Sequence, residues 1–202
     1  MDTKILAADL YALNYAKKLL SDNQLVCIPT ETVYGLAANA FCSEAIKKIF
    51  IAKNRPLNNP LIVHTHSIDA ARKLYAPLSK TAEHRFLRLT QAFWPGPLTL
   101  VVPLLDQSPL SKLALAGLST VALRVPHHPV ALKLLEAFDG PIVAPSANRS
   151  GHLSPTYAHH VEQSLGNAVP LILDGGPTTC GIESTILDVT TTTPKILRPG
   201  AL

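Results

Sequence analysis

Basic and polar side chains gather in loops of this chain that follow predicted helices or strands. Lys53 and Arg55 stand at the end of a helix predicted for residues 43–53, because Pro56 disfavours helical backbone at the residue before it. An arginine can hold phosphate oxygens with two parallel hydrogen bonds, and a lysine acts as a point charge. The pair could clamp a phosphate, although a solvated basic helix end that complements the helix dipole fits equally well.

The stretch Pro29–Leu36, PTETVYGL, follows an apolar strand predicted for residues 25–28. Ligands of open α/β sheets bind in the crevice beyond the carboxyl ends of the strands. Two threonines, a carboxylate and a phenol lie close together here, and Gly35 lets the backbone turn or approach a ligand closely. A turn in which Thr30 or Thr32 caps local backbone groups is the alternative, and the stretch alone leaves both interpretations open.

Two later segments add the same kinds of side chain. Residues 146–156 leave a strand predicted for residues 141–144, and the stretch GIESTILD at residues 181–188 precedes a final Arg-Pro-Gly at residues 198–200. The chain contains no GxxxxGK[ST] or GxSxG motif, and no GxGxxG follows a strand, which disfavours a P-loop, a nucleophile elbow or a Rossmann site. The available groups suit the binding and alignment of anions better than covalent catalysis.

Seven motifs, taken in their order along the chain, resemble the YrdC-type threonylcarbamoyl-AMP synthase family. They are PTETVYGL, KNRPLNNPLIVH, FWPGPLTLVV, TVALRVP, APSANRSGHLSPT, GIESTILD and LRPG. The resemblance implies a twisted, mixed parallel and antiparallel α/β sheet flanked by helices, with a basic concave cavity. It also implies a nucleotidyltransferase that makes L-threonylcarbamoyladenylate and pyrophosphate from L-threonine, bicarbonate and ATP for tRNA threonylcarbamoyladenosine modification.

The resemblance assigns roles to individual positions. It implies a catalytic set of Lys53, Arg55, Ser146 and Asn148. It implies ATP-binding residues Arg55, Asn59, Thr120, Ser146, Ser154 and Arg198. It implies threonine-binding residues Thr32, His64, Arg124, Ala144 and Ser184.

The residue types support these roles unequally. Arg124 is the natural bidentate partner of an amino acid carboxylate, and its apolar neighbours disfavour a surface arginine at a strand end. His64 ends an apolar strand and could equally be a core histidine. Ala144 can contribute only backbone groups. Arg198 could be a plain surface charge, so its role depends on the motif.

Composition and periodicity predict one α/β domain over residues 1–202. Of these residues 47% are hydrophobic and 16% charged, which is enough for a sizeable core. Helices are predicted at residues 7–20, 43–53, 67–75, 79–93, after Pro129 and at 156–165. Strands are predicted at residues 25–28, 61–64, 98–103, 120–125, 141–144, 169–173, 184–189 and 195–198. The last strands have no helix between them, which favours a mixed sheet. Because no further domain follows the LRPG motif, we expect the short, single-domain form of the family.

Cysteine and histidine spacing argues against disulfides and a metal site. Three widely spaced cysteines suit a reducing cytoplasm, and no apolar run is long enough to span a membrane. His64 and His66 alternate along a strand and so face opposite sides, while the adjacent histidine pairs share no helix face. We expect no protein-only metal site, and by resemblance we expect Mg²⁺ bound mainly through ATP phosphates.

Two other functions stay open at this point. A net charge of +4 also fits an RNA-binding module, although aromatic residues form only 5% of the chain and Trp94 lies in an apolar run. A sibling enzyme acting on another carbamoyl or adenylyl substrate is the second alternative. By resemblance, the expected partners of a synthase are downstream threonylcarbamoyl-transferase proteins, and direct contact with tRNA is left open.

Overall fold

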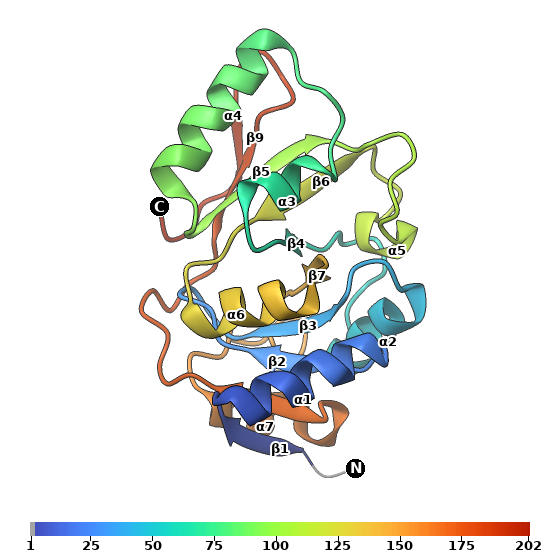
Figure 1. The fold of residues 1–202 in the computed structure, drawn as a ribbon, viewed down its shortest axis with the longest axis vertical. Coiled ribbons are helices and arrows are strands. Elements are labelled where there is room, and N and C mark those ends of the chain that lie inside the picture. Colours follow the sequence, from blue (N-terminus) through green and yellow to red (C-terminus); the bar gives the residue numbers. More distant parts are fainter. Residues whose placement is uncertain (1–2) are drawn as a thin grey trace.

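Residues 3–202, which the computed structural model describes, form a ten-stranded mixed sheet with helices on its faces (Figure 1). Its strands are β1 (Lys4–Ala7), β2 (Val26–Ile28), β3 (Gly35–Asn39), β4 (Val63–His64), β5 (Leu98–Pro103), β6 (Thr120–Arg124), β7 (Ile142–Val143), β8 (Leu171–Asp174), β9 (Thr185–Asp188) and β10 (Lys195–Arg198). Its helices are α1 (Leu10–Ser21), α2 (Ser43–Lys53), α3 (Ile68–Arg72), α4 (Lys80–Phe93), α5 (Lys112–Leu115), α6 (Pro129–Phe138) and α7 (Ala158–Leu165), followed by a 3₁₀ turn at Gly166–Ala168.

The strand order is β1-β8-β2-β3-β7-β4-β6-β5-β9-β10. The pairs β1–β8, β8–β2, β4–β6 and β5–β9 are parallel, and the other neighbouring pairs are antiparallel. This alternation confirms the mixed α/β sheet that the sequence predicts. The short strands β4 and β7 occupy the middle of the sheet and are antiparallel, so the loop that leaves β7 lies beside the segment that enters β4.

Side-chain alternation along the strands explains why helices cover both faces. Val26 and Ile28 of β2 pack with α1 and α6, and Cys27 between them packs with the opposite core, which includes α2 and α7. Figure 1 shows α1 and α6 side by side in front of β2 and β3. Each fully buried Leu, Ile or Val contributes about 1.5–3 kcal/mol to folding, so the two apolar cores hold this part of the sheet between helices.

Helix α4 covers the part of the sheet built from β5 and β6. Phe86 of α4 meets Trp94 edge to face, with ring centroids 5.8 Å apart, and lies 5.1 Å from the ring of Tyr75. Trp94 donates from its indole nitrogen to the carbonyl of Leu98, which satisfies its polar group in the core. None of the helices in residues 3–202 is long and apolar enough to cross a membrane.

Three elements, β1, β3 and α5, were not predicted from the sequence. Residues 4–7 form strand β1, and α1 starts at Leu10 rather than at residue 7 because Asp9 caps the backbone N–H of Ala12. The second half of the predicted loop after residue 28 is strand β3. Gly35 begins it, and a Cβ there would lie 3.2 Å from the Ala144 Cβ. The close approach expected at Gly35 is therefore made to the neighbouring chain segment.

Candidate active site

A cavity of about 250 Å³ lies along the central strands β4 and β6, beside the segment that enters β4 and the loop that leaves β7. Ten of the residues singled out in the sequence line it, namely Thr32, Arg55, Asn59, His64, Thr120, Arg124, Ala144, Ser146, Ser184 and Arg198. The sheet explains part of this gathering, because His64 and Arg124 are register partners in the parallel pair β4–β6. Ala144 directly follows β7, and its backbone N–H donates to the carbonyl of Ile62 beside β4.

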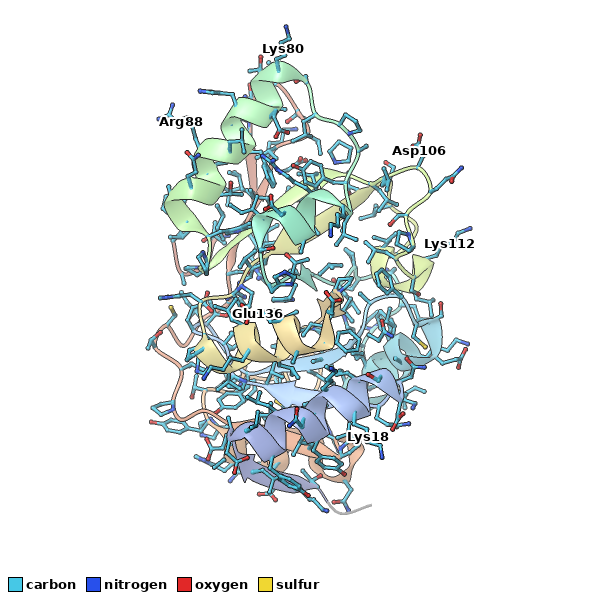
Figure 2. All side chains as sticks on the ribbon, viewed as in Figure 1. Lys18, Lys80, Arg88, Asp106, Lys112 and Glu136 are labelled. Atoms are coloured by element: carbon cyan, nitrogen blue, oxygen red, sulfur yellow. The ribbon has the colours of Figure 1, made fainter. Side chains whose placement is uncertain are left out.

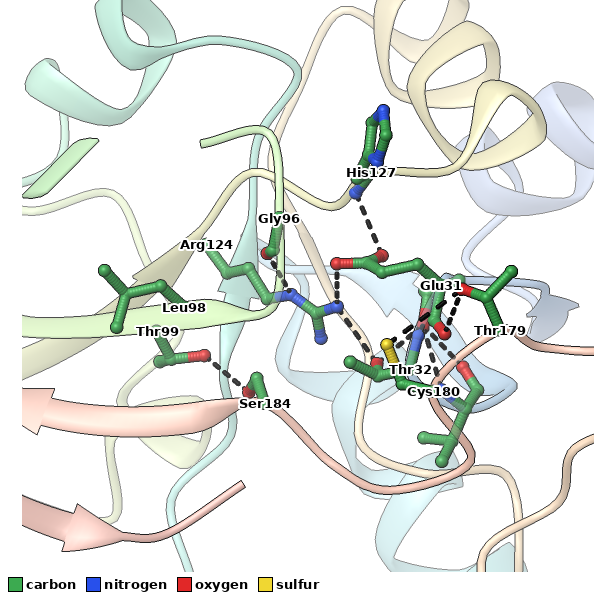
Figure 3. A network of polar contacts seen from close by, with 12 residues as sticks. Glu31, Thr32, Gly96, Leu98, Thr99, Arg124, His127, Thr179, Cys180 and Ser184 are labelled. Carbon is green, nitrogen blue, oxygen red and sulfur yellow. Dashed lines mark hydrogen bonds and ion pairs between the residues drawn. The ribbon is translucent and has the colours of Figure 1, made fainter. Parts of the chain in front are cut away.

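Arg124 is buried, with 4% of its surface exposed, which rules out a surface arginine. Its Nη2 donates to Glu31 Oε1 at 2.7 Å and to Thr32 Oγ1 at 3.0 Å, and its Nε donates to the Gly96 carbonyl at 3.1 Å (Figure 3). A guanidinium has five N–H donors, so these contacts leave the two on Nη1. No residue within 3–202 accepts a hydrogen bond from Nη1. The bidentate edge between Nε and Nη2 is therefore already occupied.

The hydroxyl of Thr32 has a fixed direction. Thr30 Oγ1 donates to the Val33 carbonyl at 2.6 Å, so its only proton is used there. In the 2.9 Å contact between the two hydroxyls, Thr32 must then be the donor. Its oxygen already accepts from Arg124, and what it can still offer the cavity is an acceptor. The local capping predicted for Thr30 is confirmed by its contacts with the backbone N–H groups of Thr32 and Val33.

His64 is both buried and part of the cavity wall, so the two interpretations of this residue hold together. Burial, and after it the charge of Arg124, lowers the pKa of His64 to about 3, so the ring is neutral at neutral pH. Its Nδ1 lies 3.2 Å from the Ile62 carbonyl, which assigns the ring proton to Nδ1. The Nε2 atom is left as a second acceptor.

Ser184 links two strands at the opposite wall of the cavity. Its hydroxyl lies 2.8 Å from the buried hydroxyl of Thr99, as Figure 3 shows. Arg198 donates from Nη2 to Ser184 Oγ at 3.1 Å and to the Ser184 carbonyl at 2.9 Å. Arg198 is thus held against β9 and is not a free surface charge. Thr99 lies within the FWPGPLTLVV motif, but as one polar residue of a predicted apolar strand it was given no role from the sequence.

Arg55 and Arg198 influence each other across the cavity. Burial is the main cause that lowers the pKa of each guanidinium. For Arg55 the charge of Arg198 adds to it, whereas for Arg198 the Glu183 carboxylate opposes it and the charge of Arg124 adds to it. Arg55 Nη2 donates to the Pro60 carbonyl at 3.0 Å, which holds the side chain against the 59–60 turn. Two like charges held near each other favour an anion between them, because the anion relieves their repulsion.

Lys53, Asn148 and Ser154 do not line the cavity. Lys53 Nζ donates to the Ser146 and Asn148 carbonyls at 2.5 Å each, and burial lowers its pKa to about 8. Asn148 Nδ2 donates to the His152 carbonyl at 2.7 Å. Ser154 Oγ donates to a carboxylate oxygen of Glu183, which does line the cavity. These three side chains therefore support the cavity wall. Lys53 does so by its hydrogen bond to the carbonyl of Ser146, which lines the cavity.

Three charged or polar side chains near the cavity were not assigned a role in the sequence. Glu31 binds Arg124, Glu183 lines the cavity, and Tyr34 donates its hydroxyl to the Gly176 carbonyl at 2.7 Å. Burial raises the pKa of Tyr34, so its hydroxyl stays protonated and ties the start of β3 to the segment after β8. Among residues 3–202, no cluster of three or more His, Cys, Asp or Glu side chains could hold a metal ion.

Sequence comparison places this chain beside known proteins. A sequence profile of the Sua5/YciO/YrdC family, described as "Telomere recombination", matches residues 18–200. The threonylcarbamoyl-AMP synthase of Pyrococcus abyssi is 46% identical over 192 residues, which are 95% of this chain and 55% of that protein. The protein of the same name in Bacillus subtilis is 48% identical over 187 residues, 93% of this chain and 53% of that one. The chain spans about half the length of these curated relatives.

A solved structure shares the fold. The crystal structure of P. abyssi Sua5 complexed with L-threonine matches with a TM-score of 0.89 and 44% sequence identity, covering 98% of this chain and 57% of that one. The expected YrdC-like fold is thereby confirmed.

Proposed function

The chain belongs to the Sua5/YciO/YrdC family, and from this premise we propose that it makes L-threonylcarbamoyladenylate. Its substrates would be L-threonine, bicarbonate and ATP, and pyrophosphate would be the second product. Support comes from curated threonylcarbamoyl-AMP synthases that are 46% and 48% identical over more than nine tenths of this chain. The comparisons favour neither an RNA-binding module nor a sibling enzyme with another substrate.

The observation that carries the proposal is the uneven distribution of charge and hydrogen-bonding capacity in the cavity. One end holds a cationic donor whose charge is balanced, Arg124 Nη1, beside two acceptors, Thr32 Oγ1 and His64 Nε2. A free amino acid presents a carboxylate and N–H groups, which complement such a set. Elsewhere in the lining are Arg55 and Arg198, which form no ion pair within residues 3–202; the Glu183 carboxylate near Arg198 offsets only part of their charge. That part of the lining suits a polyanion such as a triphosphate.

In this assignment threonine lies against β4, β6 and β9. Arg124 Nη1 donates to its carboxylate, and Thr32 and His64 accept from its amine or its hydroxyl. Ser184 and the backbone at Ala144 complete the surroundings. The neutral imidazole matters because a charged one would repel the amine and offer it no acceptor.

ATP lies toward Arg55 and Arg198, with Asn59, Thr120 and Ser146 beside it. Mg²⁺ takes oxygen ligands, keeps several waters and is commonly bound through substrate phosphates with one or two carboxylates. Glu183 is the single carboxylate that lines the cavity in the part of the chain the structure describes. We therefore assign Mg²⁺ mainly to the ATP phosphates, where it would neutralise their charge.

The substrates supply the reacting groups, so the protein acts by alignment. The threonine amine attacks the carbon of bicarbonate, water leaves, and a carbamate forms. A carbamate oxygen then attacks the α-phosphorus of ATP and pyrophosphate leaves. Holding reactants in line can lower such a barrier by about 7–11 kcal/mol in favourable cases. Lys53 and Asn148 would serve this step by fixing the loop that carries Ser146, and Ser154 by holding Glu183.

The test is the product. Mass spectrometry after incubation with ATP, ¹³C-bicarbonate and threonine should show threonylcarbamoyladenylate carrying the label, and pyrophosphate release should depend on both threonine and bicarbonate. Equal AMP formation without threonine would show simple ATP hydrolysis and overturn the proposal. We further place the enzyme in the cytoplasm, with downstream transferase proteins that pass the threonylcarbamoyl group to an adenosine of tRNA.

A further inference from the structure

Glu31 is a buried carboxylate with both oxygens occupied. Oε1 accepts from Arg124 Nη2 at 2.7 Å, and Oε2 accepts from the backbone N–H of His127 at 2.9 Å (Figure 3). Its backbone carbonyl accepts from the N–H of Cys180 and from the Thr179 hydroxyl. The side chain is therefore held from two sides, and so is the guanidinium it binds. Glu31 does not itself line the cavity.

The contact fixes how Arg124 can meet a ligand. With Nη2 bound to Glu31 and Thr32, and Nε bound to Gly96, the guanidinium cannot rotate without breaking three hydrogen bonds. Only Nη1 can bind an incoming group, so the approach is limited to one direction. Neither a carboxylate nor a phosphate can therefore take the two-nitrogen grip of this arginine, and any anion is held by Nη1 alone.

The contact also sets the local charge. The buried pair is neutral overall, and His64 beside it is uncharged at neutral pH, so this end of the cavity carries no net charge of its own. Arg55 and Arg198 form no ion pair, and Glu183, the one carboxylate of the lining within residues 3–202, offsets only part of their charge. A phosphate chain that enters the cavity is therefore drawn to one end only, which leaves the other end for an amino acid.

We propose that Glu31 is a positioning residue that determines specificity: it aims Arg124 Nη1 at the cavity and balances the arginine charge, so that this end takes an amino acid carboxylate and excludes phosphates. The inference rests on the proposed function, because it assigns the amino acid to the Arg124 end. A purely structural role would instead connect the 30–34 segment to residues 127 and 180 without affecting ligand choice.

Titration calorimetry with threonine separates the two roles through a double-mutant cycle. Glu31→Gln keeps the size of the side chain but removes the charge, and threonine binding should weaken about tenfold, or about 1.4 kcal/mol. Arg124→Ala should weaken it at least as much. In the Arg124→Ala background, Glu31→Gln should change threonine binding by less than about twofold, because its effect passes through the arginine. Additive losses would overturn the proposal.

Titration with pyrophosphate tests charge balance without threonine. Wild type should bind one pyrophosphate, at the Arg55 and Arg198 end, and Glu31→Gln should gain a second site that Arg124→Ala abolishes. Failure to gain this site would overturn the specificity role. Glu31→Asp keeps the negative charge but, with a shorter side chain, moves the carboxylate away from Arg124, so threonine binding should weaken and no second pyrophosphate site should appear. This variant decides the matter if Glu31→Gln does not fold.

Glu136→Gln is the matched control, since Glu136 is an exposed carboxylate on α6 that does not line the cavity (Figure 2). It should bind threonine and pyrophosphate as wild type does. Failure of the proposed function has a different signature. A wild-type protein that binds threonine but forms no adenylate would refute the synthase and leave the cycle intact. If threonine does not bind at all, the pyrophosphate titrations still decide the role of Glu31.

Discussion

The buried lysine at the end of α2 makes the stability of the fold depend on pH. Lys53 is 1% exposed, and burial together with the charge of Arg55 lowers its pKa from 10.5 to about 8. Between these values the unfolded chain binds more protons at this position than the folded chain. Because the free energy of unfolding rises with pH wherever the unfolded state binds more protons, the cost of the buried ammonium is present below pH 8 and is relieved up to about pH 10.5.

The size of the effect follows from the two pKa values. Each pH unit between 8 and 10.5 changes the free energy of unfolding by about 1.4 kcal/mol, so the whole window corresponds to about 3 kcal/mol. Lys53→Met removes the titrating group. It also leaves the Ser146 and Asn148 carbonyls without their donor, at about 1–3 kcal/mol each, but this cost does not vary with pH.

Urea unfolding of wild type and Lys53→Met should therefore be followed from about pH 7 to about pH 10. The wild type should gain stability relative to the variant as the pH rises through the upper part of this range. Lys47→Met, which removes an exposed lysine of the same helix that pairs with Glu44, should give a curve parallel to wild type. Parallel curves for wild type and Lys53→Met would refute the buried ammonium as the group that holds the 146–148 loop.

Two further predictions concern the cavity. Arg55→Ala should lower kcat/KM by an amount equivalent to about 3 kcal/mol of transition-state stabilisation without unfolding the chain, and Arg55→Lys should restore little of it because lysine lacks the planar, two-nitrogen donor. The control is Arg72→Ala, which removes an exposed arginine that pairs with Glu83, and near-normal turnover of Arg55→Ala would contradict the role. The pKa of His64 is lowered to about 3, so between pH 6.5 and 3 the wild type should lose up to about 1.4 kcal/mol of unfolding free energy per pH unit at this residue, and His64→Asn should not. If urea unfolding shows the same loss of stability with falling pH for both proteins, His64 is not buried as a neutral ring.

The sequence predicts most of the fold because apolar periodicity is strong in most elements. The strand at residues 98–103 and the helix ending at Lys53 were placed with the bounds that the structure has. Strand β1 was missed because its apolar stretch is only a few residues long and runs into the helix predicted from residue 7, so periodicity does not separate the two. Strand β3 was missed because its sequence, GLAAN, contains glycine, alanine and asparagine, which are uncommon in strands.

The site was predicted as a set of residues but not as a set of contacts. The motifs gather Arg124, Thr32 and Ser184, yet nothing in the sequence couples Glu31 with Arg124 or Thr99 with Ser184. Such pairs join segments far apart in the chain, and only the strand order brings them together. The sequence suggested a bidentate grip of Arg124 on a carboxylate, and it could not show that Glu31, Thr32 and Gly96 occupy the guanidinium edge between Nε and Nη2.

The order of strands in the sheet determines when the binding site can form during synthesis of the chain. Strand β2 lies between β3 and β8, and β5 lies between β6 and β9, so both wait for partners that are synthesised much later. Contacts between such distant segments form slowly, because loop closure costs entropy before the contacts stabilise the fold. Thr32 and Arg198 share one cavity across almost the whole described chain, so a growing polypeptide has no complete binding site until β10 has joined. Ligand binding then stabilises only the finished sheet and draws the folding equilibrium towards it by mass action.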